Sequence, residues 1–401
     1  MRVSTSEFNQ STTNTILDQQ SQLLKTQNQI GTGRRILTPS DDPSGATRAL
    51  NIDKAVKSTE QFQRNNEQAE LRLNQEDSVL DQVSNVTSRI RELTVQANNG
   101  TQTENSRASI AAELRERRDE LVDLANSRDG RGEFLFAGFQ SETQPFLREG
   151  GEVRYQGDQG QRDVQVGPSR RVESSHNGFE AFMDIPQGDR DFRVDPSESN
   201  SGGARLDGAS VVDGSVAMNG PYEARFEEDA DGNLDQIIED GSGTVVANEP
   251  YVPGEPLTFN GRQITFEGTP DDGDSFAISE SGRQSIFDTV DGIVESLESR
   301  GDDKADQARL ATENFQALEN LDAAIDSFSE TRAETGARLN ALESESETNE
   351  AAKVDLETEL SRVEDLDFAE AISRLNQQQA GLQAAQQSFS QVQNLSLFQF
   401  I

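Results

Sequence analysis

The sequence predicts a mainly α-helical protein with one β-rich domain inserted near its middle. Both ends of the chain carry apolar residues three and four positions apart, which is the spacing of helices that pack against other helices. Helical spacing continues inward from both ends, whereas residues 150–282 are rich in Gly, Pro and Asp and contain short alternating runs. We therefore expect paired termini, a long helical coiled-coil rod formed by both halves of the chain, and a central, outer β-rich domain.

The C-terminal stretch, residues 368–401, carries the clearest helical seam. No charged residue occurs from position 376 to the end, although the whole chain has a formal net charge of −37. An exposed helix normally carries charges on its outer face, so this helix is either an ordinary buried one or one that becomes buried when subunits assemble. We favour the second interpretation. Two series of residues, each spaced by seven, define the seam: Phe368, Leu375, Leu382 and Phe389, and Ala371, Gln378, Ala385 and Val392.

The first 30 residues are also poor in charge and predict a helix that pairs with the C-terminal one. Such uncharged amphipathic helices are marginally stable alone, so we expect residues 1–45 and 366–401 to form a terminal coiled-coil layer that is disordered in the free monomer. The apolar seams would then bury against neighbouring subunits. The candidate assembly contacts are Phe8, Ile16, Leu23, Ile30, Phe368, Leu375, Leu382, Phe389 and Val392.

A loop follows the N-terminal helix, because Gly, Pro and Asp crowd the segment GTGRRILTPSDDPSGA at residues 31–46. Arg34 and Arg35 lie within this loop. We interpret them as solvated charges rather than as a functional pair.

The predicted rod consists of residues 46–149 and 283–365. In its first part, helical spacing ends at the Asn98-Asn99-Gly100 triplet, and Thr101 with Glu104 predicts a capping box for the next helix. The aromatic segment 133–146 is expected to pack over this hairpin as a strand or as extended chain. The apolar residues that show the helical spacing most clearly are Val79, Val83, Val86, Ile90, Leu93 and Ala97, then Ile110, Leu114, Leu121 and Leu124.

The second part of the rod begins with a short helix at residues 286–297. The longest pattern of the chain then runs from Ala305 to Val363, which would span roughly 90 Å as one helix. Its register does not continue into the C-terminal seam. We therefore place a bend at residues 365–367, between two helical layers.

The β-rich domain is predicted at residues 150–282. Asn260-Gly261 between two alternating runs predicts a hairpin. The segment DADGNLD at residues 229–235 lacks the Gly and Glu positions of an EF-hand loop, so we interpret it as a polar turn. His176 is the only His and lies in no motif, so no role is assigned to it. The six expected strands are centred on 164–166, 192–194, 222–226, 257–259, 264–266 and 276–278.

Composition excludes several classes of function. The pI of about 4.3 disfavours binding to nucleic acid or to an anionic membrane, and the acidity itself has two open explanations, salt adaptation and solubility. The chain has no Cys, which excludes thiol catalysis and Cys-based metal sites. We find no phosphate loop, dinucleotide fingerprint or nucleophile elbow, and thus expect no enzyme, cofactor or metal centre. No apolar run could span a membrane, and the first residues do not form a cleavable signal peptide.

Five segments together resemble the flagellin superfamily. They are MRVSTSEF at the start, the loop GTGRRILTPSDDPSGA, the helix RELTVQANNGTQTENSRASIAAEL, the segment GEFLFAGFQSETQPF, and the C-terminal EDLDFAEAISRLNQQQAGLQAAQQSFSQVQNLSLFQFI. They cover about half of the chain. The start and the segment at 132–146 resemble the hook–filament junction branch of the superfamily more than its filament subunits. The central β-rich region matches nothing in particular.

This resemblance implies a structural, non-enzymatic protein of the bacterial flagellum, outside the cell. It would leave the cell unfolded through the flagellar type III export apparatus, aided by a dedicated export chaperone that engages the C-terminal helical region. The terminal helices would form the inner tube of an assembly of identical subunits, seated on hook-associated protein 1, and present a surface on which flagellin polymerises. Two alternatives stay open: a filament subunit, and a helical stalk that carries a ligand-binding β domain.

Overall fold

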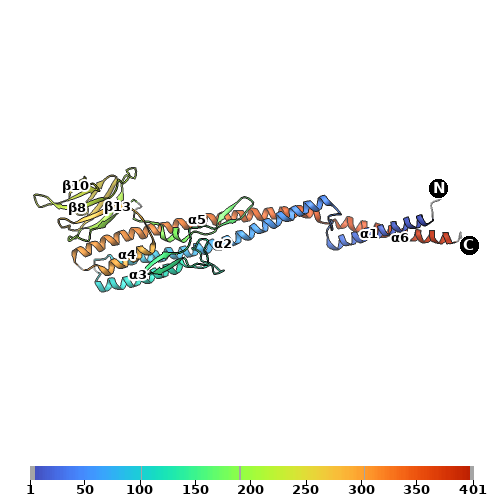
Figure 1. Ribbon diagram of the computed structural model, residues 1–401, viewed down its shortest axis with the longest axis horizontal. Helices are drawn as coiled ribbons and strands as arrows, with labels where there is room; N and C mark the ends of the chain where they lie inside the picture. Colours follow the sequence, from blue (N-terminus) through green and yellow to red (C-terminus); the bar gives the residue numbers. More distant parts are fainter. Residues whose placement is uncertain (1–4, 101, 189–190, 302, 398–401) are drawn as a thin grey trace. The chain divides into compact units, whose positions relative to one another are not determined.

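The computed structural model describes residues 5–100, 102–188, 191–301 and 303–397 (Figure 1). The chain divides into two compact units, Met1–Arg64 with Glu345–Ile401, and Asn65–Ser344. Both contain segments from the two halves of the sequence. The expected fold class, helical ends around a central β-rich part, is confirmed. The predicted domain boundaries remain predictions.

The smaller unit is helical. It contains α1 (Thr5–Thr32), α6 (Phe368–Leu397), the start of α2 (Pro43–Ala97) and the end of α5 (Lys304–Glu364). The helices α2 and α5 meet in a small core, since their apolar side chains fall on facing stripes. The predicted bend at 365–367 is confirmed, because α5 ends and α6 begins on either side of it. This core contains Ala49, Ile52, Val56 and Val363, with Ile36, Leu356 and Leu360 partly buried beside it.

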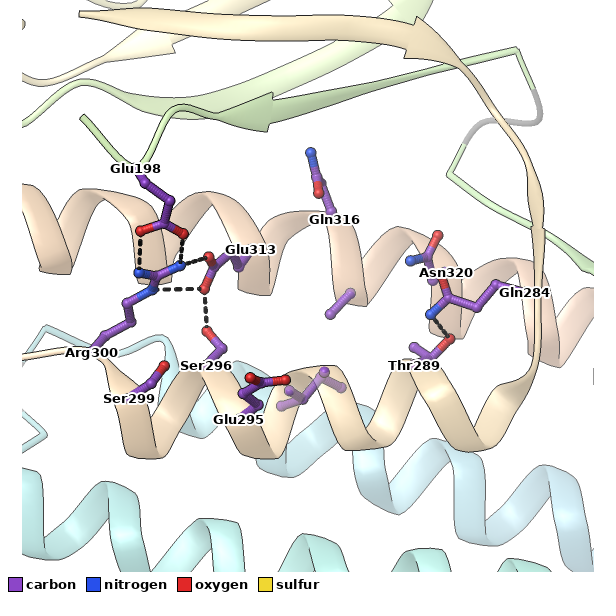
Figure 2. Close-up of a pocket in the computed structure, with 13 residues that line it drawn as sticks. Glu198, Gln284, Thr289, Glu295, Ser296, Ser299, Arg300, Glu313, Gln316 and Asn320 are labelled. Atoms are coloured by element: carbon purple, nitrogen blue, oxygen red, sulfur yellow. Dashed lines mark hydrogen bonds and ion pairs between the residues drawn. The ribbon is translucent and has the colours of Figure 1, made fainter. Parts of the chain in front are cut away.

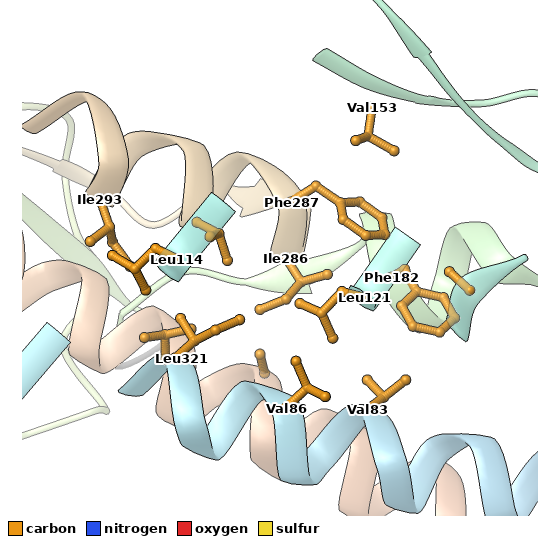
Figure 3. Packing of buried hydrophobic residues seen from close by; sticks show 14 of the residues in the cluster. Val83, Val86, Leu114, Leu121, Val153, Phe182, Ile286, Phe287, Ile293 and Leu321 are labelled. Atoms are coloured by element: carbon orange, nitrogen blue, oxygen red, sulfur yellow. The ribbon is translucent and has the colours of Figure 1, made fainter. Parts of the chain in front are cut away.

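The larger unit is built on the rest of α2 and α5, with α3 (Glu104–Ala125) and α4 (Ile286–Ser299). Its α2 portion shows an unbroken alternation of three and four residues among buried positions, which is the spacing of a coiled-coil seam. The predicted apolar positions of α2 and α3 lie in its core, except for Leu124, which is only partly buried (Figure 3). The buried positions that follow this spacing are Asn66, Ala69, Leu73, Glu76, Leu80, Val83, Thr87, Ile90, Thr94 and Ala97.

The start of α3 differs from the prediction. Thr103 is its N-cap, and the Thr103 hydroxyl accepts a hydrogen bond from the backbone N–H of Ser106. Since Glu104 is the first helical residue, it cannot supply the third position of a capping box. Thr101 lies outside the described residues. A Thr two positions later therefore performs the capping.

The aromatic segment 133–146 packs on the helices as expected, but turns and a bridge occupy most of it. Phe146 begins β1 and lies in the same aromatic cluster as Phe182 and Phe287, with ring centroids 5.4 and 5.5 Å from its own. Figure 3 shows Phe182 and Phe287 against α2 and α5. The short helix η1 (Phe179–Met183) supplies Phe182. This cluster attaches the irregular segment firmly to the helical core.

The central strands form two larger sheets that enclose a second core. One sheet has the order β10-β9-β8-β13-β6 and the other β11-β12-β7. All pairs are antiparallel, and inward-facing apolar residues alternate with exposed ones. The strands are β6 (Phe192–Pro196), β7 (Arg205–Val211), β8 (Tyr222–Glu228), β9 (Leu234–Asp240), β10 (Val245–Pro250), β11 (Pro256–Phe259), β12 (Arg262–Glu267) and β13 (Ser275–Glu280).

Three two-stranded ladders accompany these sheets in the described residues. They pair β1 (Phe146–Glu149) with β2 (Glu152–Tyr155), β3 (Asp163–Gln165) with β4 (Arg171–Glu173), and β5 (Ile185–Pro186) with β14 (Arg283–Gln284). All six predicted runs coincide with strands, whereas several other strands, such as β9 and β10, had not been predicted.

Both turn predictions in this region are confirmed. Asn260 and Gly261 join β11 to β12 with positive φ values of 41° and 76°, the geometry of a tight type I′ hairpin. Asp229 closes the turn between β8 and β9, because its carboxylate accepts hydrogen bonds from the backbone N–H groups of Asp231 and Asn233, both at 2.8 Å. Residues 229–235 therefore contain a polar hairpin turn that is stabilised by hydrogen bonds to its own Asp229 side chain.

Candidate assembly interface

The terminal helices α1 and α6 pack against each other in antiparallel orientation (Figure 1). Their shared end is fixed where the backbone N–H of Leu366 donates to the carbonyl of Gly33 at 2.9 Å. Both helices rise by the same distance per residue, so Ile30 stands near the level of Phe368, and successive seam positions follow at steps of seven. The two predicted seams therefore run side by side.

Burial within this pair is confined to the end where the two helices join. Thr26 and Ala371 are buried there, with exposures of 3% and 0%. No described side chain of α1 before Thr26, or of α6 after Ala371, is buried. The seam positions farther along both helices are only partly buried, so part of their apolar surface stays in contact with water.

The candidate residues lie on this partly covered seam. Phe368 is exposed, at 50%. Phe8 and Val392 belong to α1 and α6, but their side chains lie outside what the structure describes. The others are half buried: Ile16, Leu23, Ile30, Leu375, Leu382 and Phe389. Their role as contacts between subunits stays a prediction.

Three exposed apolar residues were not among the candidates. Leu17 and Leu24 lie on the outer side of α1, at 56% and 55% exposure, and Ile372 lies on α6 at 49%. The sequence could have identified two of them, because Leu17 and Leu24 are themselves spaced by seven. These three residues add exposed apolar area to the pair outside its seam positions.

The loop after α1 is tied to the bend between α5 and α6. The backbone N–H of Arg35 donates to the carbonyl of Glu364 at 2.6 Å, and its guanidinium donates to the carbonyl of Val363 at 2.8 Å. Arg34 forms an isolated bridge with Asp365. The interpretation of these arginines as simple solvated charges is therefore wrong for Arg35, which links the two halves of the chain where the helices α5 and α6 meet.

The acidic residues of the loop hold its turns. The Asp41 carboxylate accepts hydrogen bonds from the backbone N–H groups of Leu37 and Thr38, and it lies 2.7 Å from the Lys25 ammonium on α1. The hydrogen bond from Lys25, followed by that from Thr38, lowers the pKa of Asp41 from 3.8 to about 2. The loop is thus fastened to the terminal helix at neutral pH.

The next acidic residue starts α2. The Asp42 carboxylate accepts a hydrogen bond from the backbone N–H of Gly45 at 2.9 Å, while Pro43 occupies the first helical position. A Cβ at position 45 would lie 2.4 Å from an Asp42 carboxylate oxygen, so only Gly fits this cap. The turn chemistry of the predicted loop thereby defines the start of the long helix.

A polar pocket of the larger unit lies between α4 and α5 beside the turn that follows β6 (Figure 2). Arg300 donates two hydrogen bonds to the Glu198 carboxylate, at 2.8 and 2.7 Å, and also reaches Glu313. The Ser296 hydroxyl donates to Glu313 at 2.6 Å. These charged groups satisfy one another, so the pocket resembles a structural ion-pair cluster that fastens β6 to α4 and α5.

The described residues contain no group of three or more His, Asp or Glu arranged to hold a metal ion. Among them, no helix is long and apolar enough to cross a membrane. The feature with the clearest capacity for binding is therefore the incompletely covered helix pair.

Two protein-family models match the ends of the chain. The bacterial flagellin N-terminal helical region matches residues 3–141, and the bacterial flagellin C-terminal helical region matches residues 318–401. These segments contain both terminal helices. Flagellar hook-associated protein 3 of Escherichia coli (strain K12) is 27% identical to the chain over 400 residues, which cover 100% of this chain and 99% of that protein.

Two solved structures are also similar. The crystal structure of FlgL from Xanthomonas campestris is 31% identical, with a TM-score of 0.71, and the similarity covers 77% of this chain and 99% of that one. The crystal structure of flagellar hook associated protein-3 from Legionella pneumophila is 30% identical, with a TM-score of 0.75, covering 78% of this chain and 98% of that one. The chain thus resembles these proteins along nearly its whole sequence and over about three quarters of its structure.

Proposed function

Because this chain belongs to the hook-associated protein 3 (FlgL) family of the flagellin superfamily, we propose that it is a structural component of the flagellum at the hook–filament junction. There it would complete the hook-associated zone and offer flagellin a surface for polymerisation. The relatives are named as flagellar parts, which supports a structural rather than an enzymatic role.

One observation on the chain itself carries this proposal. The α1–α6 pair buries its seam only near the loop and leaves Phe368, Leu17 and Leu24 exposed. A chain with strong negative charge would gain nothing from a charge-poor, half-covered helix pair unless other protein covers it. Repeated contacts of one kind between identical subunits could cover it, and such contacts build rings and helical assemblies.

The domains would then act as successive layers. Residues 1–45 and 366–401 would form the inner layer and become ordered on assembly, residues 46–149 and 283–365 the rod, and residues 150–282 the outer part. The contact of Arg35 with the α5–α6 bend supports a joint between the first two layers. The nine candidate seam residues would be the inner contacts.

The partners follow from this place in the flagellum. They would be further copies of the chain, flagellin, and hook-associated protein 1. Before assembly the chain would bind an export chaperone and the type III export apparatus, and it would pass to the cell exterior unfolded. The helices of the terminal layer support this route, because marginally stable segments unfold at little cost.

The test is deletion and complementation in the host. Electron microscopy would examine the cell surface, and blotting would follow flagellin in the medium. We expect hooks without filaments and flagellin monomers shed into the medium, with both defects reversed by the intact gene. Absence of any flagellin chain would instead identify the filament subunit, and intact filaments would overturn the proposal in favour of a stalk with a binding domain.

A further inference from the structure

The only histidine of the chain is buried in the larger unit. His176 lies between β4 and η1 and is 4% exposed. Its ring Nδ1 contacts a Glu76 carboxylate oxygen, and its ring Nε2 lies 3.2 Å from the Glu334 carboxylate. The backbone N–H of His176 also donates to Glu76. One side chain thus bridges α2 and α5, two long helices that come from opposite halves of the sequence.

Glu76 occupies an unusual place for an acidic residue. It belongs to the coiled-coil seam of α2, between Leu73 and Leu80, and it is completely buried. An unpaired carboxylate at such a position would be strongly destabilising. Its partner is the imidazole of His176, which approaches from a segment about 100 residues away in sequence. Folding therefore depends on bringing this pair together.

The two carboxylates beside the ring favour its doubly protonated state. Ionised carboxylates only accept hydrogen bonds, and a neutral imidazole carries a single N–H donor. Since Glu76 and Glu334 face both ring nitrogens, both contacts are satisfied only when the imidazole is doubly protonated and positively charged. The contact between His176 and Glu76 is then a charge-assisted hydrogen bond.

Charged groups of both signs surround the ring. Glu180, Asp184, Glu330 and Arg283 line the small pocket beside it. On the other side, Glu173 of β4 pairs with Arg338, whose guanidinium lies 3.5 Å from Nδ1, and Arg72 of α2 faces Glu76. Burial and Arg338 lower the pKa of His176, but the hydrogen bond and charge of Glu76 outweigh them, with help from Glu334, so that the pKa is raised above 6.5.

We propose that His176 is a proton-dependent clamp, which holds α2, α5 and the segment before η1 together as an imidazolium and releases them when the solution becomes alkaline. Loss of the proton removes the cation that hydrogen-bonds to Glu76 and leaves Arg72 as the cation that faces this buried carboxylate. The segment at 174–178 is then held less strongly against the helices, and its separation from them exposes Glu76 to water. The clamp is a property of the folded monomer and does not depend on the place of the chain in an assembly.

The direction of the pH effect follows from the raised pKa. Below about pH 6.5 the histidine is protonated in both the folded and the unfolded chain, so the stabilisation is complete. It is lost as the pH rises through the higher pKa of the folded state. Alkaline solution should therefore lower the melting temperature, in the range where few other side chains titrate.

The full-length chain offers a direct measurement, because one histidine gives one imidazole signal. With histidine labelled at Cε1, NMR spectra from about pH 5 to about pH 9 follow its titration across the range that brackets an ordinary histidine. We expect a single midpoint above 6.5 in the folded protein and a midpoint near 6.5 in denaturant. A folded-state midpoint at or below 6.5 would overturn the proposal.

Two variants separate the clamp from a merely structural contact. Thermal melts of His176→Gln, followed by circular dichroism, should lose the decline in melting temperature that the parent shows between neutral and alkaline pH. Glu334 is 58% exposed at its side chain, so Glu334→Gln should fold and move the NMR midpoint downward. If His176→Gln keeps the parental pH dependence, or Glu334→Gln leaves the midpoint unchanged, the clamp is refuted.

Discussion

Replacement of Leu382 by Asp tests the assembly interface most sharply. Leu382 lies on the seam of α6, is half buried against α1, and belongs to the uncharged C-terminal stretch. The substitution places a carboxylate where the proposed neighbouring subunits would complete the burial. It should spare the larger unit, since α6 makes no part of that core.

The magnitude follows from burial. Full burial of a leucine is worth about 1.5–3 kcal/mol, and half of it remains to be gained on assembly, so the lost packing costs about 1 kcal/mol. A carboxylate that must be protonated to enter an apolar contact, from a pKa of about 4 at about pH 7, costs a further ~4 kcal/mol. The sum, about 5 kcal/mol per subunit, lowers the association constant by more than about a thousandfold.

The assay is motility and filament growth after complementation of the deletion strain, with the secreted protein quantified by blotting. Leu382→Ala removes only the packing and should be impaired less than Leu382→Asp. Gln383→Asp is the matched control, because it adds the same charge to an exposed neighbouring position of α6. Normal motility with Leu382→Asp would refute the interface, and equal defects from both Asp variants would show that charge, not seam position, matters.

Three further outcomes are expected. Phe182→Ala should lower the free energy of unfolding, measured by chemical denaturation, by about 3–5 kcal/mol, because the ring is fully buried among aromatic side chains. The control Phe139→Ala should change this free energy by less than about 0.5 kcal/mol, because Phe139 is exposed. Similar values for the two variants would contradict the described core. Because the pKa of Asp41 is lowered to about 2, the stabilisation from its carboxylate is complete above about pH 4 and is lost as the pH falls through about 2. The backbone amides of the loop should therefore be better protected in the parent than in Asp41→Asn at neutral pH, and this difference should shrink between about pH 4 and about pH 2. A difference that persists at pH 2 would argue against the ion pair with Lys25. Deletion of residues 376–401 should give a helical monomer that melts cooperatively but does not assemble, and loss of cooperative melting would instead place α6 in the monomer core.

Much of the local structure could be predicted because it depends on neighbours in sequence. The seam of α2 follows from spacing alone, the break at 365–367 follows from a change of register, and Asn260-Gly261 requires the positive φ values of a tight hairpin. The strands β9 and β10 were missed because their apolar residues are adjacent in sequence, Ile237 with Ile238 and Val245 with Val246, so they show no alternating pattern.

The candidate interface was predicted only in part. Spacing by seven located the seam residues of both terminal helices, but it could not show how little of that seam one chain buries, because coverage depends on the partner helix. The exposed apolar residues Leu17, Leu24 and Ile372 were left out for the same reason. Spacing defines a face of a helix and does not define what lies against it.

The sequence by itself determined the periodic helices, the loop chemistry, the absence of thiol chemistry and the uncharged character of the C-terminal end, since these properties are carried by residues close together in the chain. Only the tertiary structure decided the pairs that join distant segments. Arg35 looked like a solvated charge and instead binds the carbonyl of Val363, and His176 lay in no motif and instead contacts Glu76 within a helical seam. The physical reason is that the energy of a buried charge depends on its partner in space, and sequence spacing contains no information about a partner about 100 or more residues away.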